Sequence, residues 1–463
     1  MVLSRNCARV ARLITLSALC AASARAAPPL VVSGDRHGLV RADGTPFFWL
    51  GDTAWLLFHR LDRAQTEHYL RDRARKGFTV IQAVAVADFA KEANPQVMSA
   101  LLEGDPRRPN PAFFAHVDWV VQRANELGLT IGLLPCWGDA WNPYPGEPAA
   151  IFDVDNARAF GAFLGQRYRD ADLVWILGGD HRVDSEGQRE ILRAMAAGLR
   201  EGDGGTHLIT FHPPGANGSS TWLHDEPWLD FNMRQNGHAA EYREYEKTRQ
   251  DWARTPTKPV VDGEPLYEDH PLSFKQAELG HSVSADTRRA LYWDLFNGAF
   301  GHTFGNHAVW QFWSPEVAPL NDPLMPWTEA LSQPGAAQMK YAHKLLASRP
   351  GQRIPDETVL VAARVPTAVP GSGRYRFVSV RDAEHSWAMV YAPIGRPFSV
   401  RLDAIHAARV QASWFDPRTG QARAAGRYVA RGVREFVPPA EGELSDWILV
   451  LDDATKKRAK PGS

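Results

Sequence analysis

Short apolar runs alternate with amphipathic helical patterns between residues 30 and 348. The run 173–177 holds five consecutive apolar residues, as in a strand buried on both faces, whereas residues 113–124 repeat apolar side chains at helical spacing. About eight such strand–helix units predict an α/β fold, a closed (β/α)8 TIM barrel. A doubly wound open sheet is the alternative, but no glycine-rich phosphate loop follows the first strand. The expected strands are 47–50, 80–86, 129–137, 173–177, 208–212, 229–232, 259–264 and 308–312.

Local signals predict a hairpin and one helix near the start of the barrel. Asp43-Gly44 is a strong hairpin signal because both residues tolerate the positive φ angles of a tight turn. Asp62 is suited to cap the helix that follows, Gln65 stands where a capping box needs it, and Gly77 ends the helix.

The pattern changes to short strands separated by turns after Ser348. No helical spacing lies between these strands, so we expect a small antiparallel β-sandwich joined to the barrel through Arg349-Pro350-Gly351. The predicted strands are 374–380, 386–392, 398–402, 411–415 and 447–451. The predicted parts of the chain are a signal peptide at 1–26, a catalytic barrel at 27–350, a sandwich domain at 351–455 and a disordered tail at 456–463.

The amino terminus has the form of a cleavable signal peptide. Arginines precede an apolar run at 13–22, and Ala24-Arg25-Ala26 has the small-x-small pattern of a cleavage site. The run is too short for a permanent membrane anchor, so we expect a secreted or periplasmic protein with no membrane partner. Removal of the signal leaves Cys136 as the one cysteine, which predicts stability without an internal disulfide.

Charge and aromatic content narrow the choice of ligands. The net charge of -1 over 463 residues gives no electrostatic reason to expect nucleic acid or an anionic membrane as a partner. Sixteen tryptophans are available, and although most should fill the core, their flat faces suit the C–H faces of sugar rings. We therefore expect an oligosaccharide or polysaccharide partner; the oligomeric state stays open.

Two acidic residues follow predicted strands, each beside glycine. Asp180 comes after Gly178-Gly179, and Glu264 ends the segment 259–264. The carboxyl ends of parallel strands are where barrels keep their chemistry, and glycoside hydrolysis needs one proton donor and one carboxylate anion. A single carboxylate near a strand end is more often a helix cap or an ion-pair partner. The recurrence of the pattern predicts that Asp180 and Glu264 form a catalytic pair.

Further polar and aromatic side chains follow the other predicted strands. Sugars are bound by several hydrogen bonds and an aromatic wall, and this set offers both, although each residue alone has a structural alternative in the core. The candidate substrate-binding residues are Asp52, Trp55, Gln82, Trp137, Asp139, His212, Asn232, Gln235, His302 and Trp310.

Rival chemistries have weaker support. The sequence has no His-Glu-x-x-His motif and no paired cysteines, so we expect no zinc site and no cofactor. A carbohydrate esterase is disfavoured because no Gly-x-Ser-x-Gly elbow is present. A carbohydrate-binding protein that has lost activity is disfavoured because both carboxylates are retained.

Several motifs, in order along the barrel, resemble those of the apiosidase-like family, glycoside hydrolase family 140. The segment after residue 350 resembles the β-domain that accompanies these barrels and is sometimes labelled collagen-binding. The motifs are Gly51-Asp52-Thr53-Ala54-Trp55, Gly178-Gly179-Asp180, Phe211-His212-Pro213 and Asp262-Gly263-Glu264-Pro265 with Tyr267-Glu268.

The resemblance implies a retaining glycosidase in which Asp180 is the general acid/base after strand four and Glu264 the nucleophile at strand seven. Tyr267 joins the candidate substrate-binding residues through the same motif. Many related barrels carry Asn-Glu after strand four, whereas this chain has Gly179-Asp180, so the shorter acid must lie closer to the leaving oxygen. The implied substrate is apiose in side chains of the pectic polysaccharide rhamnogalacturonan II.

Overall fold

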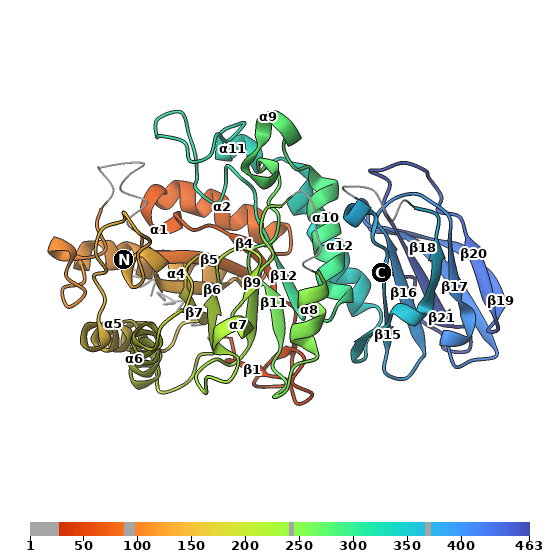
Figure 1. Cartoon of the computed structure of the whole chain (residues 1–463), viewed down its shortest axis with the longest axis horizontal. Helices are drawn as coiled ribbons and strands as arrows, with labels where there is room; N and C mark the ends of the chain where they lie inside the picture. Colours follow the sequence, from red (N-terminus) through yellow and green to blue (C-terminus); the bar gives the residue numbers. More distant parts are fainter. Residues whose placement is uncertain (1–26, 88–97, 240–244, 366–371) are drawn as a thin grey trace, which may run out of the picture.

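The computed structural model describes residues 27–87, 98–239, 245–365 and 372–463. Within these ranges the chain forms a barrel followed by a β-domain, which is blue in Figure 1. The predicted signal peptide lies outside the described residues. No helix in the described ranges is both long and apolar enough to cross a membrane.

Eight parallel strands, arranged in chain order, curve into a nearly closed barrel (Figure 1). The last strand pairs with the first, and the gap between β8 and β10 is bridged by hydrogen bonds from Asp230 N to Ile209 O (2.9 Å) and from Thr210 Oγ1 to Phe231 O (2.7 Å). The predicted barrel is therefore confirmed. Its strands are β4 (Leu50–Thr53), β5 (Val80–Val86), β6 (Thr130–Cys136), β7 (Leu173–Gly178), β8 (Ile209–His212), β10 (Asn232–Gln235), β11 (Val260–Asp262) and β12 (Gly301–Phe304).

Helices surround the barrel. Asp62 caps the first long helix as predicted, since its Oδ1 accepts from Gln65 N (2.8 Å) and its own N–H donates to Gln65 Oε1 (3.0 Å). The longer helices are α2 (Arg63–Arg75), α4 (Pro111–Glu126), α5 (Val154–Arg167), α6 (Glu186–Asp203), α8 (Tyr245–Trp252), α10 (Ser284–Phe296) and α12 (Pro334–Ala347). Shorter helical turns are α1 (Leu57–Arg60), α7 (Ser220–Leu223), α9 (Gln276–Leu279) and α11 (Trp327–Ala330).

Three barrel strands lie away from their predicted positions. The first strand is β4 and not residues 47–50, the sixth is β10 and not residues 229–232, and the eighth is β12 and not residues 308–312. Strands β10 and β12 are rich in buried polar residues, so apolar runs did not mark them. These side chains pair with acids on the surrounding helices α8 and α10: Arg234 with Asp251 (2.8 Å) and His302 with Asp294 (2.8 Å).

The second domain is an antiparallel β-sandwich, as predicted. Its sheets enclose a separate apolar core that includes Phe398, Trp414 and Leu449. The larger sheet contains β13 (Arg353–Pro355), β15 (Val378–Asp382), β16 (Trp387–Ala392), β21 (Trp447–Asp453), β18 (Arg409–Asp416) and β19 (Gln421–Val429). The smaller contains β14 (Leu360–Ala363), β17 (Phe398–Arg401) and β20 (Val433–Phe436).

Three short strands precede the barrel, and a further one extends its sheet. Strands β2 (Leu39–Arg41) and β3 (Pro46–Phe47) are antiparallel, which confirms the hairpin at Asp43-Gly44, and β1 (Leu30–Val32) pairs with β2. Strand β9 (Asn217–Gly218) runs antiparallel to β10.

The carboxyl-terminal segment 456–463 differs from the disordered tail that its sequence predicts. The Arg458 guanidinium donates to Ser386 Oγ (2.6 Å), and Gly462 N donates to Ser348 Oγ (3.0 Å). Arg458 also lies 3.7 Å from Asp452, so a carboxylate at the end of the sandwich attracts a residue that composition alone assigns to solvent.

Helix α10 joins the two domains. Its Arg288 forms a two-pronged ion pair with Asp446 of the sandwich (2.8 and 3.0 Å), and both side chains are buried. Tyr292 stacks on Tyr391 at a centroid distance of 4.9 Å. The domains therefore share a buried interface with specific polar contacts.

Replacing Arg288 with alanine should lower the free energy of unfolding by about 3–5 kcal/mol, because Asp446 would keep a buried, unpaired charge. Arg158→Ala, which breaks an exposed ion pair with Glu201, is the control and should cost about 0–1 kcal/mol. Urea denaturation compares the two variants. Equal losses would contradict a stabilising role for the interface pair.

Candidate active site

Asp180 sits on a sharp turn at the carboxyl end of β7. Gly178, Gly179 and Asp180 have φ angles of 98°, 103° and 59°, so three consecutive residues occupy the left-handed region. Glycine is required at the first position, since a Cβ on Gly178 would lie 2.4 Å from the carbonyl oxygen of His212. Asp180 bears the strain of a non-glycine residue in this region, as residues at functional sites often do.

Glu264 stands two residues beyond β11, between two histidines. Its N–H donates to Asp262 Oδ1 (3.1 Å). Oε2 of its carboxylate lies 3.1 Å from Nε2 of His212, and Oε1 lies 3.1 Å from Nε2 of His238. The carboxylate is therefore held on both sides.

The two acids share one cavity of about 500 Å3. One carboxylate oxygen from each of Asp180 and Glu264 and one nitrogen of His212 lie within 4.8 Å of one another. Asp180 keeps 39% of its side-chain surface exposed, whereas Glu264 keeps 6%. The cavity is lined by Trp55, Trp137, Tyr144, Asp180, Gly215, Gln235, Gly237, His238, Glu264, Tyr267, His270, Phe274, Trp310, Leu320 and Asn321.

The surroundings shift the pKa values of the two acids in opposite directions. Burial and the charge of Glu264 raise the pKa of Asp180 to about 7, against the smaller opposing effects of His212 and Gln235. Burial alone would raise the pKa of Glu264, but its contacts with His212 and His238 outweigh burial and lower that pKa. Near neutrality the cavity therefore presents one carboxylate and one carboxyl group that still holds a proton for part of the time.

His212 lies between the two acids, 3.6 Å from Asp180 and 3.1 Å from Glu264. Burial alone would lower its pKa, but contact with Glu264 and the charges of Glu264 and Asp180 raise it above its ordinary value. The rings of Trp55 and Trp137 pack on it at centroid distances of 5.1 and 5.8 Å. One ligand atom from each of Asp180, His212 and Glu264 lies within 4.8 Å of the others, which is also the spacing of metal ligands.

Aromatic rings form much of the cavity wall. Trp55 and Trp137 contact each other edge to face at 5.3 Å, and Tyr144 donates its hydroxyl to the carbonyl oxygen of Asp180 (2.8 Å). Phe274 is 57% exposed and packs edge-on against His270 at 4.9 Å. Such rings offer flat apolar faces to a sugar while the polar groups fix its hydroxyls.

The structure brings together part of the predicted set. Asp180 and Glu264 face each other, and His212 lies between them. Five of the other candidates line the same cavity: Trp55, Trp137, Gln235, Tyr267 and Trp310.

Five candidates do not line this cavity. Asp52 pairs with Arg73 (2.6 Å), and Asn232 donates to the ring of His224 (3.1 Å). The amide of Gln82 donates to the carbonyl oxygen of Gly263 (2.8 Å), so it touches the loop that carries Glu264. The remaining two are His302, which pairs with Asp294, and Asp139.

Other cavity residues were missed from the sequence. His238 comes three residues after β10, so correct placement of that strand would have brought it into the set. Tyr144, His270, Phe274 and Asn321 stand on longer loops, where no strand end marks them.

Fold and site together define the chain as a barrel glycosidase with an added β-sandwich. Residues 33–352 match the family described as "Apiosidase-like, catalytic domain", and residues 354–452 match "Putative collagen-binding domain of a collagenase". The chain therefore belongs to the apiosidase-like family.

Similar solved structures are glycoside hydrolases. A protein described as "Glycoside hydrolase" is 32% identical, with a TM-score of 0.82 over 93% of this chain and 98% of its own. A glycoside hydrolase family 5 protein from Bacteroides vulgatus ATCC 8482 is 30% identical, with a TM-score of 0.82 over 94% of this chain and 95% of its own. No curated protein is similar enough to this chain to be matched.

Glu264→Gln should lower the pKa of Asp180 from about 7, because the neighbouring negative charge is removed while His212 remains. Carbon-13 NMR titration of labelled aspartate carboxyl groups measures the change. Glu201→Gln, which removes an exposed charge on α6, should leave this pKa unchanged. An unchanged Asp180 pKa in Glu264→Gln would show that the two acids do not interact.

Proposed function

We propose that the protein is a retaining glycoside hydrolase in which Glu264 is the nucleophile and Asp180 the general acid/base. The observation that carries this proposal is that two acids facing each other in one cavity have contacts that shift their pKa values in opposite directions. Environments that drive two carboxyl groups apart in pKa divide them into a proton donor and an anion. These are the two groups that cleavage of a glycosidic bond requires.

The first step joins the sugar to Glu264. The carboxylate attacks the anomeric carbon while Asp180 gives its proton to the departing oxygen, so the leaving group departs as an alcohol. His212 and His238 keep Glu264 ionised before attack, since both contact its oxygens.

The second step releases the sugar. Once Glu264 is an ester it carries no negative charge, and one cause of the raised Asp180 pKa is gone. Asp180, which lost its proton in the first step, therefore stays ionised and is available as the base: it takes a proton from the attacking water as the water oxygen bonds to the anomeric carbon, and Glu264 leaves as a carboxylate. One residue serves as acid and then as base because covalent bonding changes its neighbour's charge.

The spacing of the acids supports retention of configuration. One oxygen atom of each acid lies within 4.8 Å of the other, which is compatible with the carboxyl separation of roughly 5–5.5 Å in retaining enzymes. Inverting enzymes separate the two carboxyl groups by about 6.5–9.5 Å to admit a water molecule.

The substrate we propose is pectic polysaccharide, with apiose of rhamnogalacturonan II as the sugar released. The apiosidase-like family supports this choice, and the aromatic cavity suits a sugar ring. We further propose assignment to glycoside hydrolase family 140 and export through a signal peptide at residues 1–26, since a polymeric substrate lies outside the cell.

Pectic oligosaccharides provide a direct test of this function. Incubation of the pure protein with rhamnogalacturonan II side chains should release apiose, detected as a new reducing sugar by chromatography. Release of acetate would instead indicate an esterase, and tight binding without any product would indicate a carbohydrate-binding protein.

Substitution of each acid by alanine should affect hydrolysis differently. Glu264→Ala should abolish hydrolysis of 2,4-dinitrophenyl apioside, since no glycosyl-enzyme can form, and azide should restore turnover with inverted product. Asp180→Ala should still release dinitrophenol in a first burst, because this leaving group needs no proton, and azide should restore turnover with retained product.

Circular dichroism checks that both variants are folded. Azide rescue with the two product configurations exchanged would reverse the roles, and full activity in both variants would refute the carboxylate pair.

A further inference from the structure

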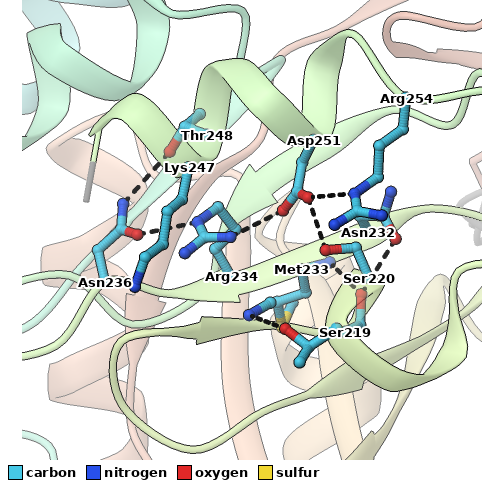
Figure 2. A network of polar contacts seen from close by, with 12 residues as sticks. Ser219, Ser220, Asn232, Met233, Arg234, Asn236, Lys247, Thr248, Asp251 and Arg254 are labelled. Carbon is cyan, nitrogen blue, oxygen red and sulfur yellow. Dashed lines mark hydrogen bonds and ion pairs between the residues drawn. The ribbon is translucent and has the colours of Figure 1, made fainter.

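A buried polar network lies beside the carboxyl ends of β10 and β11. Figure 2 shows Arg234 of β10 between Asp251 of α8 and Asn236, with donor–acceptor distances of 2.8 and 3.0 Å. Asp251 also accepts from Ser220 Oγ (2.6 Å) and from Arg254 Nε (2.9 Å). None of these side chains lines the cavity of Asp180 and Glu264.

The network continues from Asn236 to a second buried acid. Oδ1 of Asp294 accepts from Asn236 Nδ2 (2.9 Å) and from Thr248 Oγ1 (3.2 Å). Its other oxygen lies 2.8 Å from Nδ1 of His302. Helices α8 and α10 are thereby tied to the ends of strands β10 and β12.

Asp262 connects this network to the nucleophile. It ends β11, is fully buried, and stands two residues before Glu264. Its Oδ1 accepts from the N–H of Glu264 (3.1 Å) and from the N–H of Asn236 (3.4 Å), so one carboxyl oxygen holds the ends of two neighbouring strands. Atoms of Asp262, Asp294 and His302 lie within 4.8 Å of one another.

Charge balance indicates one proton on the Asp262–Asp294 pair. The buried pair of Arg234 and Asp251 is neutral, and the side chain of Arg254 is 44% exposed, so solvent compensates its charge. Ionisation of both Asp262 and Asp294 would therefore leave two uncompensated negative charges in the buried site, and a proton on one of the two acids lowers this cost.

The pKa values agree with this balance. Burial, and then the charge of Asp294, raise the pKa of Asp262 well above its ordinary value, and burial raises the pKa of Asp294 to about 7. Burial lowers the pKa of His302 to about 4, so its ring is neutral near pH 7.

We propose that Asp262, backed by Asp294 and His302, is a positioning residue that fixes the backbone of Glu264 and so holds its carboxylate between His212 and His238. The inference rests on the proposed role of Glu264 and goes beyond it, because Asp262 does not line the cavity. Its hydrogen bond to the candidate nucleophile is the one from the Glu264 amide.

The test compares two substitutions at position 262. Asp262→Asn keeps an oxygen acceptor for both amides and resembles the protonated acid, so kcat should stay within about twofold. Asp262→Ala removes the acceptor, and kcat should fall about 100-fold with little change in KM, as expected for a misplaced reacting group. The probe is 2,4-dinitrophenyl apioside, whose leaving group needs no proton, so cleavage reports on attack by Glu264.

The pH profile separates positioning from loss of stability. A loosened Glu264 loses part of its contact with His212 and His238, so the acid limb of kcat/KM should move to higher pH in Asp262→Ala. Asp203→Ala is the matched control, because Asp203 is equally buried but lies on α6, where it binds Trp175 and His207. This control should lower the melting temperature without moving the acid limb.

Two results would overturn the inference: an acid limb in Asp262→Ala that coincides with that of Asp203→Ala, or an Asp262→Asn variant as impaired as the alanine variant. If Asp262→Ala does not fold, Asp262→Val replaces it, because valine fills the space without offering an acceptor, and its kcat and pH profile are compared in the same way. The kcat of Asp262→Asn tests the inference independently of both variants. Failure of the proposed function is separate, since wild-type protein would then not cleave the probe.

Discussion

Two carboxyl groups whose oxygens lie within 4.8 Å of each other do not both stay ionised without compensation, and the rest of the site follows from this constraint. His212 and His238 contact opposite oxygens of Glu264 and stabilise its charge. Asp180 has no such pair of partners, so burial and the charge of Glu264 raise its pKa to about 7. Because the two histidines contact Glu264, Glu264 is the acid with the lower pKa, and this difference in pKa supports Glu264 as the nucleophile.

The fold produces this difference in pKa by the groups that it places at the ends of its strands. Parallel strands bring β7, β8, β10 and β11 to one rim of the barrel, where each adds a different group. The left-handed turn at Gly178-Gly179-Asp180 brings the acid close to His212. Behind Glu264, the buried Asp262 accepts hydrogen bonds from the N–H groups of Glu264 and Asn236 and so fixes the carboxyl end of β11. Among the residues that the structure describes, none from the sandwich domain lines the cavity, and the ion pair of Asp446 with Arg288 braces α10, the helix that also carries Asp294.

Much of this could be predicted from apolar runs and turn signals. Strand β5 matches its predicted limits, and the Asp180–Glu264 pair was found because each acid follows a buried strand. The strands β10 and β12 were misplaced because their buried polar side chains pair with acids on helices α8 and α10, which a hydrophobic pattern cannot reveal. The same error hid His238, and cavity residues on long loops, such as Tyr144, depend on tertiary contacts that sequence spacing does not encode. Asp52 was grouped with the site because of its strand end, but Arg73 neutralises it in the core.

The central claim is that a covalent bond forms between the sugar and Glu264. Mass spectrometry of the protein after reaction with a 2-deoxy-2-fluoro apiosyl fluoride tests it most directly, because fluorine beside the anomeric carbon slows release of the sugar more than it slows an activated first step. The account predicts an increase by the mass of one fluorosugar, on the peptide that contains Glu264. Rapid turnover of the probe without any adduct, or an adduct on another residue, would contradict it.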